Sequence, residues 1–366
     1  MNARLIRFAA VSMLALAASA AQAEDKVLNV YNWSDYIAKD TLAKFTAETG
    51  IKVKYDTYGE NEELDSKLMA GKSGYDVVFP SASPFFAAQV KAGVYQKLDL
   101  AKIPNAAGVD KGVLANLSKV DPGNAYGLPY MMAATGIGYN IDKVKALLPD
   151  APTNSWAMLF DPAVAAKLKS CGISVLNTPT EAVPAMLAYQ GKDPQAQTTE
   201  ALNAAMDALM PLRPNYRYVH SEKYRADLAN GDICVAHGYV GDLVQSRARA
   251  KEAKKKQNIG ILIPKEGAQV NIDMMAVPAQ APHPEAAHAF INFILRPDII
   301  AAITDETGYA NAVPASLPLV AAEIAKDPVI FPPAEVQAKL FTAPPPAPKE
   351  FDRVRTRAWS KFRSAK

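Results

Sequence analysis

Residues 31–40 read YNWSDYIAKD, and they directly follow a short stretch of strand-favouring residues, Val27 to Tyr31. The end of this expected strand carries two large aromatic side chains, a hydroxyl and a carboxylate. In open α/β folds, ligands bind at the carboxyl ends of the strands. Aromatic rings attract positive charge through their quadrupole, and a carboxylate adds charge-assisted hydrogen bonds. The segment therefore predicts an α/β fold with a site for a cation that has a hydrocarbon body.

The first 23 residues have the pattern of a cleavable export signal. Arg4 and Arg7 form a basic start, Phe8 to Ala18 is apolar, and Ala21 to Ala23 is a small-x-small cleavage site. We expect the mature chain to begin near Glu24. The apolar run is too short to span a bilayer, and no later segment reaches the roughly 20 apolar residues of a membrane helix. No cysteine follows the signal, so a lipid anchor is not expected there.

Charge, length and cysteine count limit the class of protein further. The formal charge is +3, and removal of Arg4 and Arg7 leaves +1, so nucleic acid is not an expected partner. The remaining chain of about 343 residues is long enough for two lobes. Two cysteines, Cys171 and Cys234, read as one disulfide in an oxidising compartment, with two buried free thiols as the alternative. Neither lies in a CxxC motif, which argues against redox catalysis.

Short strand-like segments alternate with Ala-rich amphipathic ones, the pattern of βαβ units. Gly127 to Asn140 predicts an extended crossover out of the first lobe, because Gly and Pro break helices and the apolar run is long for one strand. We expect a first lobe of residues 24–132 and 259–308, and a second of 133–258 and 309–366. Strands are predicted for Val27–Tyr31, Ile51–Tyr58, Tyr75–Pro80, Ile173–Leu176, Gly231–Ala236, Ile259–Ile263 and Asp273–Val277, and helices for Lys39–Thr49, Asn61–Ala70, Val183–Tyr189, Thr198–Met210 and Pro284–Leu295.

Signatures of catalysis and metal binding are missing from the sequence. It has no GxSxG, HExxH or Walker A motif, and its four histidines lack metal-ligand spacing. Gly136 to Gly138 starts like a dinucleotide fingerprint but lacks the third glycine, so it reads as a place where the backbone packs closely. The basic run from Arg247 to Lys256 reads as a solvated helix face. No cofactor, metal or catalytic residue is therefore predicted.

Nine short segments in fixed order span nearly the whole chain after the export signal. They are Tyr31–Tyr36 (YNWSDY), Lys67–Gly71 (KLMAG), Pro80–Ser83 (PSAS), Thr135–Asn140 (TGIGYN), Leu168–Gly172 (LKSCG), Leu228–Val235 (LANGDICV), Pro264–Gly267 (PKEG), Tyr309–Asn311 (YAN) and Asp352–Trp359 (DRVRTRAW). Together they resemble the periplasmic polyamine-binding proteins of ABC importers, particularly the putrescine-binding branch.

The resemblance implies a two-lobed periplasmic binding protein of the type II-like class. Each lobe would be a mixed sheet flanked by helices, with hinge crossovers between the lobes and a Cys171–Cys234 disulfide in the second. It implies a monomer in the periplasm that captures a polyamine, putrescine or a related diamine, in the cleft between the lobes. The partner is the membrane permease of an ABC importer, and no cofactor is implied.

The resemblance also implies the ligand-binding positions. Asp242 and Asp273 correspond to the carboxylates that bind the amines, and Tyr309 to an aromatic wall. Each position has a structural alternative: Tyr36 and Tyr309 as core residues, Asp35 and Glu181 as helix caps. The full set is Trp33, Ser34, Asp35, Tyr36, Ser81, Glu181, Ser221, Tyr239, Asp242, Asn271, Asp273 and Tyr309.

Three positions depart from the putrescine-binding pattern, which has larger aromatic or apolar residues at Tyr239, Asn271 and Pro84. A smaller and more polar wall would admit a longer amine, a guanidinium end such as agmatine's, or extra water. An amino-acid cargo is an alternative, but it calls for an arginine facing the ligand carboxylate, and none stands at the mapped positions. A ferric ion held by paired tyrosines is another alternative. An exported hydrolase or lyase that uses Asp35, Asp242 or Glu181 as acid and base is the alternative from another class.

Overall fold

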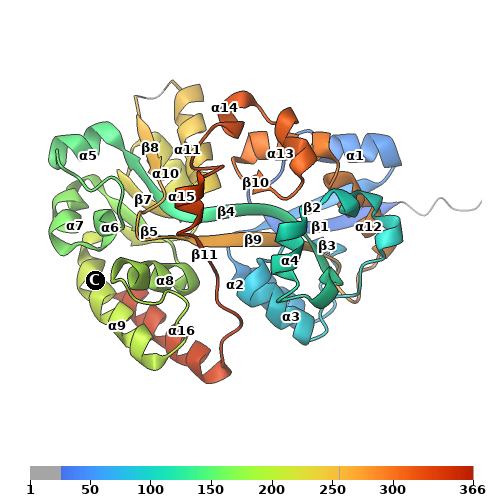
Figure 1. Ribbon diagram of the computed structural model, residues 1–366, viewed down its shortest axis with the longest axis horizontal. Helices are drawn as coiled ribbons and strands as arrows, with labels where there is room; N and C mark the ends of the chain where they lie inside the picture. Colours follow the sequence, from blue (N-terminus) through green and yellow to red (C-terminus); the bar gives the residue numbers. More distant parts are fainter. Residues whose placement is uncertain (1–25, 255, 366) are drawn as a thin grey trace, which may run out of the picture.

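The computed structural model describes residues 26–254 and 256–365 (Figure 1). The predicted export signal lies outside these residues. The strands are β1 (Val27–Trp33), β2 (Lys52–Tyr58), β3 (Val77–Val78), β4 (Gly127–Asn140), β5 (Ile173–Val175), β6 (Tyr218–Val219), β7 (Val235–Tyr239), β8 (Ile259–Leu262), β9 (Gln269–Ala276), β10 (Ala310–Asn311) and β11 (Phe341–Thr342). The α-helices are α1 (Thr41–Thr49), α2 (Asn61–Met69), α3 (Ala87–Lys91), α4 (Lys111–Leu117), α5 (Ile141–Leu147), α6 (Ala157–Phe160), α7 (Pro162–Leu168), α8 (Pro179–Tyr189), α9 (Thr199–Leu209), α10 (Tyr224–Asn230), α11 (Val240–Glu252), α12 (Pro284–Ile294), α13 (Pro297–Thr307), α14 (Ala322–Ala325), α15 (Ala334–Gln337) and α16 (Lys349–Ser364).

In the described part of the chain, eleven strands form one mixed sheet. Its order is β2-β1-β3-β9-β4-β7-β5-β6, while β8 and β10 pair with β4, and β11 with β9. The parallel pairs β1–β2 and β1–β3 lie at one end, and β5–β7 and β5–β6 lie at the other. In Figure 1 these two ends lie on opposite sides, and the long strands β4 and β9 run across the middle. Each parallel end is thus the centre of one lobe.

The long strand β4 connects the lobes because it changes its partner along its length. Gly127 to Ala134 pairs antiparallel with β9, whereas Thr135 to Tyr139 pairs antiparallel with β7. The predicted crossover over Gly127 to Asn140 is confirmed in its bounds, although it forms one strand with an irregularity near Pro129. A side chain at Gly136 would collide with the carbonyl oxygen of Leu262, so the backbone does pack closely there.

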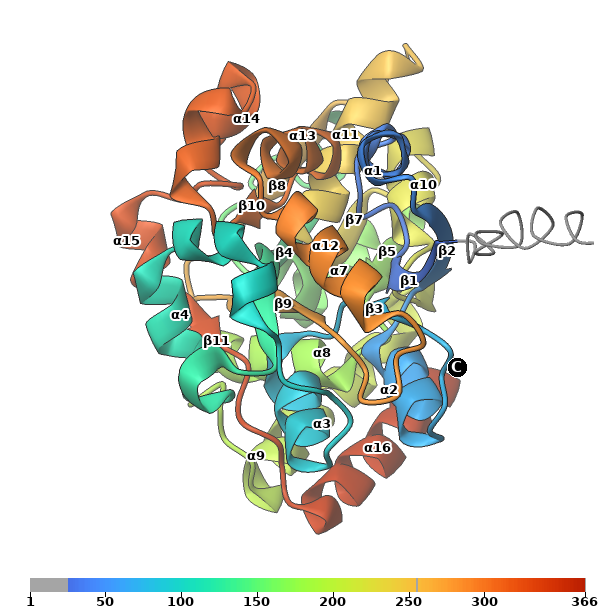
Figure 2. The same ribbon diagram turned by 90° about the vertical axis from the view of Figure 1, so that its right-hand side faces the viewer.

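Separate apolar cores lie on the two sides of this crossover. On the first-lobe side, Val30, Phe45 and Phe290 are fully buried together. On the second-lobe side, Trp156 and Leu187 are buried in a cluster that also takes Phe351, Trp359 and Phe362 from α16. The helix α16 lies beside α9 in both views (Figures 1 and 2). Figure 2, seen from the first-lobe side, shows α3, α4 and α12 in front of the sheet.

The strand β8 suggests a later lobe boundary than the sequence does. Ile259 packs with Leu228 and Leu243 of the second lobe, and β8 pairs with the last residues of β4. We therefore propose that the return to the first lobe lies within β9 rather than at residue 259. Tyr309 packs in the first-lobe core, so we propose that the second crossing follows it.

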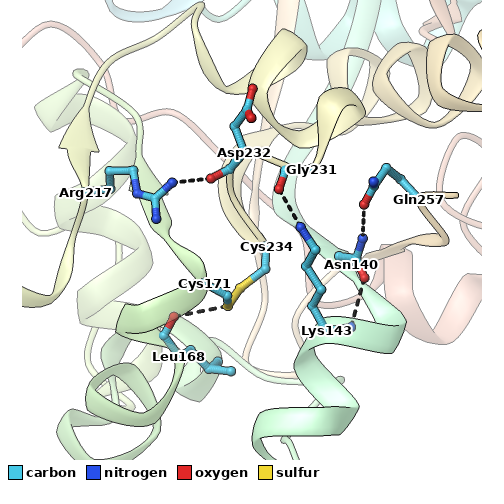
Figure 3. The surroundings of a disulfide bond; sticks show 9 residues. All are labelled: Asn140, Lys143, Leu168, Cys171, Arg217, Gly231, Asp232, Cys234 and Gln257. Atoms are coloured by element: carbon cyan, nitrogen blue, oxygen red, sulfur yellow. Dashed lines mark hydrogen bonds between the residues drawn. A yellow bond between two sulfur atoms is a disulfide. The ribbon is translucent and has the colours of Figure 1, made fainter. Parts of the chain in front are cut away.

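The predicted disulfide between Cys171 and Cys234 is present, with Cα atoms 5.5 Å apart and 63 residues of sequence separation (Figure 3). Cys171 stands just before β5 and Cys234 just before β7, and these two strands pair in parallel at Ile173 and Val235. The bond therefore fixes the entry points of two neighbouring second-lobe strands. Beside it, Arg217 donates a hydrogen bond to the carbonyl oxygen of Asp232.

Three strand predictions were wrong in their bounds. The strand expected over Asp273 to Val277 runs from Gln269 to Ala276. The strand expected over Gly231 to Ala236 begins only at Val235, because Gly231, with φ of 83°, terminates α10. The strand expected over Tyr75 to Pro80 is reduced to Val77 and Val78. The helix α10 itself was not predicted, and it carries a residue that matters in the cleft.

No single helix of the described residues is long and apolar enough to cross a membrane. Only the pair α12 and α13 reaches that length and composition, and the pair bends by 75° at its break. Both helices bury apolar side chains in the first-lobe core, among them Phe290 and Ile300.

Candidate functional site

A cleft opens beside the crossover strands and is walled by residues from both lobes. The structure brings ten of the twelve predicted positions to its lining, and the role of each in ligand binding stays a prediction. The cleft is lined by Trp33, Ser34, Tyr36, Tyr58, Gly59, Ser81, Ala133, Ser221, Glu222, Arg225, Tyr239, Asp242, Asn271, Asp273 and Tyr309. Asp35, Glu181 and Pro84 are not among these residues.

The end of β1 shapes the first-lobe wall. The Trp33 indole donates a hydrogen bond of 2.8 Å to the Phe79 carbonyl oxygen, and the Tyr58 hydroxyl donates to the same oxygen at 2.6 Å. The two rings lie 4.6 Å apart. Their polar atoms are thus used by the protein, and their ring surfaces remain for the cleft. Asp35 follows in a turn with φ of 57°, and the N-cap of α1 is Asp40, so Asp35 is not a helix cap.

Asp273, on β9, forms one polar end of the cleft. Its carboxylate accepts hydrogen bonds from the Tyr36 hydroxyl at 2.8 Å and from the Ser81 hydroxyl at 2.6 Å. Burial raises its pKa to about 6, although both of these hydrogen bonds oppose the rise. The carboxylate is therefore mainly ionised at neutral pH. Among the ion pairs of residues 26–254 and 256–365, none involves Asp273.

Asp242, in the first turn of α11, forms the other polar end. The Tyr224 hydroxyl donates to its Oδ2 at 2.6 Å, and the Tyr309 hydroxyl donates to its Oδ1 at 2.9 Å. The Tyr309 ring packs edge-on against Tyr36, with centroids 4.6 Å apart, and Tyr36 is the ring that bonds Asp273. Two adjacent tyrosines, Tyr36 and Tyr309, thus connect the two carboxylates. Both tyrosines are buried as core residues are, and both also line the cleft.

Arg225, on α10, also lies in the cleft, although it is not among the positions that the resemblance implied. Its Nη1 atom donates to the Ser34 carbonyl oxygen at 3.1 Å, and it lies 3.5 Å from Asp35 Oδ2 and 3.8 Å from Asp242 Oδ1. Its Nη2 atom lies 3.8 Å from Glu222 Oε1. Burial alone would lower the pKa of Arg225, but the charge of Asp242, with further contributions that include Asp35, raises it. This guanidinium is a fixed positive charge that reaches from the second lobe to the first.

Sequence reasoning missed Arg225 because α10 was not recognised as a helix beside the cleft. The available signal was spacing. Arg225 follows Ser221 by four residues, a separation that places side chains on one face wherever the chain turns as a helix. Ser221 lines the cleft, and its hydroxyl accepts the Asn177 backbone N–H at 3.1 Å.

Two predicted residues, Glu181 and Asp35, are not in the lining. The Glu181 Oε1 atom accepts hydrogen bonds from Gln269 at 2.7 Å and from Asn271 at 2.9 Å, and its Oε2 atom has no partner. Burial raises the pKa of Glu181 to about 8, so it is mainly protonated at neutral pH. It makes no side-chain cap on α8, whose N-cap is Thr178. Asp35 pairs with Arg249 at 3.0 Å and with Arg225. We propose that both residues act on a ligand through their cleft-lining partners.

The described residues contain no group of three His, Cys, Asp or Glu side chains arranged to hold a metal ion. The nearest histidine in sequence to Asp242, His237, is fully buried, packs edge-on against Trp156 and is not in the lining. The cleft lining holds three carboxylates (Glu222, Asp242 and Asp273), one guanidinium and several aromatic rings.

Comparisons with known proteins extend over nearly the whole chain. Residues 40–332 match the family model for bacterial extracellular solute-binding proteins. The chain is 51% identical over 357 residues to the putrescine-binding periplasmic protein PotF of Escherichia coli strain K12, covering 97% of this chain and 96% of that protein. It is 37% identical over 351 residues to a putrescine/agmatine-binding protein of Pseudomonas aeruginosa, covering 96% and 95%. Among solved structures, a putative spermidine/putrescine ABC transporter protein from Listeria monocytogenes superposes with a TM-score of 0.81 at 26% identity, covering 93% of this chain and all of that one. The predicted two-lobed fold and the predicted family are confirmed.

Proposed function

The chain belongs to the bacterial extracellular solute-binding proteins, and from that premise we propose that it captures a linear polyamine in the cleft and delivers it to the permease of an ABC importer. The names of the relatives at 51% and 37% identity, which refer to putrescine and agmatine, support this proposal. Their periplasmic description supports the same compartment for the mature chain. The protein acts as a carrier that returns its ligand unchanged, rather than as an enzyme.

The observation that carries the proposal is the unpaired charge of Asp273. This carboxylate is 8% exposed and mainly ionised at neutral pH, and the hydrogen-bond donors that it has in the described part of the chain are two neutral hydroxyls. A buried charge without a partner is costly, so a ligand cation placed there gains from neutralising it. Alkyl amines have pKa values near that of lysine, about 10.4, and carry the required charge.

The cleft walls suit the hydrocarbon part of such a ligand. Trp33, Tyr36, Tyr239 and Tyr309 present ring surfaces around the space between the two polar ends. Burying four CH₂ groups would contribute roughly 3 kcal/mol, at about 0.8 kcal/mol each. The rings also favour the charged ends through cation–π attraction.

Closure of the lobes follows from the way the lining is divided. Trp33 and Ser81 come from the first lobe, whereas Ser221 and Asp242 come from the second. A ligand that touches both sets binds the closed arrangement better than the open one, and this difference in affinity shifts the population toward closure. The closed form is the species that we propose the permease recognises.

Calorimetric titration with putrescine, cadaverine, spermidine and agmatine tests the proposal. At least one of these amines is expected to bind with a Kd below 1 mM, and mass spectrometry should recover it unchanged. If none of the four binds below 1 mM, the polyamine proposal fails. A chemical change in the recovered ligand would instead support an exported enzyme.

A further inference from the structure

The guanidinium of Arg225 occupies a set of acceptors that would suit a ligand ammonium group. Its Nη1 atom is bound by the Ser34 carbonyl oxygen at 3.1 Å and lies close to the carboxylates of Asp242 and Asp35. Arg225 is 9% exposed and the side chain of Asp242 is 11% exposed, so this pair is buried inside the cleft, whereas the side chains of Asp35 and Glu222 are partly exposed. The acceptors come from both lobes: Ser34 and Asp35 follow β1, and Asp242 begins α11.

We infer that Arg225 fills the second cation position of the cleft, so that the protein prefers a linear amine with one ammonium group, bound by Asp273, and an uncharged polar end near Arg225. This inference rests on the proposed function and narrows its ligand class. A diamine monoacylated at one nitrogen has these features. Its free ammonium matches Asp273, its methylenes match the aromatic walls, and its acyl oxygen is an acceptor for a guanidinium N–H.

The two polar ends of the cleft differ in what the protein itself supplies. At one end, Asp273 receives only hydroxyl donors, from Tyr36 and Ser81. At the other, Asp242 has hydroxyl donors on both oxygens and the Arg225 guanidinium 3.8 Å from Oδ1. A second ligand ammonium would therefore meet a positive charge already in place, whereas the first meets none.

Displacement of Arg225 by a diamine would have to break several contacts at once. Nη1 and Nη2 together hold the Ser34 carbonyl and three carboxylates of the described chain within 3.8 Å. The pair with Asp242 is buried on both sides, and breaking it would leave an uncompensated buried charge, which is strongly unfavourable. The arginine therefore stays while a ligand with a neutral end binds.

The same surroundings argue against a ligand carboxylate at this end. An amino-acid cargo needs an arginine that is free to form a bidentate pair. Around Arg225, the carboxylates of Asp35, Asp242 and Glu222 would repel a further anion at close range. An uncharged acceptor fits the arginine without this repulsion.

The test is calorimetry with N-acetylputrescine and putrescine on the full mature chain and on Arg225→Met, which keeps a flexible unbranched side chain but removes the charged guanidinium. The wild type is expected to bind N-acetylputrescine at least tenfold more tightly than putrescine. In Arg225→Met, the vacated position should accept the second ammonium, so putrescine is expected to bind at least tenfold more tightly than it does to the wild type. Arg225→Gln provides a second neutral variant with the same expectation if the methionine variant is not folded by circular dichroism.

Arg249→Met is the matched control, because Arg249 also pairs with Asp35 but is 43% exposed in its side chain and is not in the cleft lining. It loses the same charge, and putrescine affinity should change less than threefold. If Arg225→Met and Arg249→Met gain the same putrescine affinity, the gain comes from the lower net charge of the protein and not from the vacated cation position, and the inference is overturned. A wild type that prefers putrescine, or a neutral Arg225 variant without the gain, would also overturn it. In each of these cases, the polyamine proposal still holds if putrescine binds with a Kd below 1 mM. That proposal fails only if putrescine, cadaverine, spermidine and agmatine all do not bind below 1 mM.

Discussion

The two polar ends of the cleft have the same kind of residue at their centre and opposite electrostatic states. Asp273 and Asp242 are equally buried, at 8% exposure, and each accepts two hydrogen bonds from hydroxyl groups. Within residues 26–254 and 256–365, no cation pairs with Asp273, while Arg225 lies beside Asp242. The number of carboxylates in a cleft therefore does not by itself give the number of positive charges on its ligand, because a cation of the protein can already neutralise one of the carboxylates.

The largest expected effect comes from removing the unpaired carboxylate. Asp273→Asn should weaken amine binding by about 3 kcal/mol, on the order of 100-fold, because the ligand ammonium loses its only buried counter-charge. Asp242→Asn should weaken it by less than tenfold, because Arg225 already neutralises that carboxylate. Calorimetry on both variants, with circular dichroism to confirm folding, makes the comparison. Equal losses in the two variants would show that the ends are equivalent.

The pH dependence of binding should come from the Asp273 end of the cleft. Burial raises the pKa of Asp273 to about 6 in the free protein, and protonation competes with the ligand cation. Affinity is therefore full above pH 6 and falls as the pH drops through 6, by up to about tenfold per pH unit. The ligand amine stays charged throughout, since its own pKa is near 10. Titrations between pH 4.5 and 8 measure the profile.

Asp273→Asn is the control for that profile. Its residual binding should vary little between pH 5 and 7, because the titrating group is gone. A profile that stays as steep in the variant would assign the pH dependence to another group, and the contrast between the two ends would lose its electrostatic basis.

The sequence predicted that the carboxylates of Asp242 and Asp273 line the cleft, but it did not predict the arginine that lies beside one of them. Trp33 stands in one of the nine motifs at the end of β1, Asp242 lies in the first turn of α11, and Asp273 lies within β9. Arg225 lies on α10, where its residue type carries no local signal of burial or of a partner. Its contacts with Asp35 and Ser34 join residues about 190 positions apart, and only the packed lobes bring them together.

The same limit applies to the fold. Strands with strong apolar patterns, such as β1 and β2, were predicted to within two residues, and the bounds of β4 were predicted as those of a crossover, although not as a single strand. The residue at which β4 changes its partner from β9 to β7 could not be predicted, because β7 and β9 come from distant parts of the chain. Long-range pairing, rather than local propensity, decides where one lobe ends.

A smaller effect is expected from the hydroxyl that holds Asp273 in its ionised form. The Ser81 hydroxyl donates at 2.6 Å and opposes the burial that raises the pKa of Asp273. Ser81→Ala should therefore move the midpoint of the binding profile to higher pH and weaken binding well below pH 6 by about fivefold, the value of a hydrogen bond of about 1 kcal/mol. Ser83→Ala, which removes a hydroxyl that donates to the Pro344 carbonyl outside the cleft lining, is the control and should leave the midpoint in place. A midpoint unchanged in Ser81→Ala would contradict the proposed role of this hydroxyl.

The smallest effect at neutral pH is expected at Glu181, the acidic residue behind Asn271. Burial raises its pKa to about 8, so at pH 7 it is mainly protonated and Glu181→Gln should change amine affinity less than threefold. As the pH rises through 8, the wild-type carboxyl ionises and adds negative charge behind the cation site, whereas glutamine cannot. The ratio of wild-type affinity to Glu181→Gln affinity should therefore be several-fold larger at pH 9 than at pH 7. The ligand amine is still largely charged at pH 9. A large loss in Glu181→Gln already at pH 7 would mean that Glu181 is ionised when ligand is bound, and the Asp273 end would then hold two counter-charges instead of one.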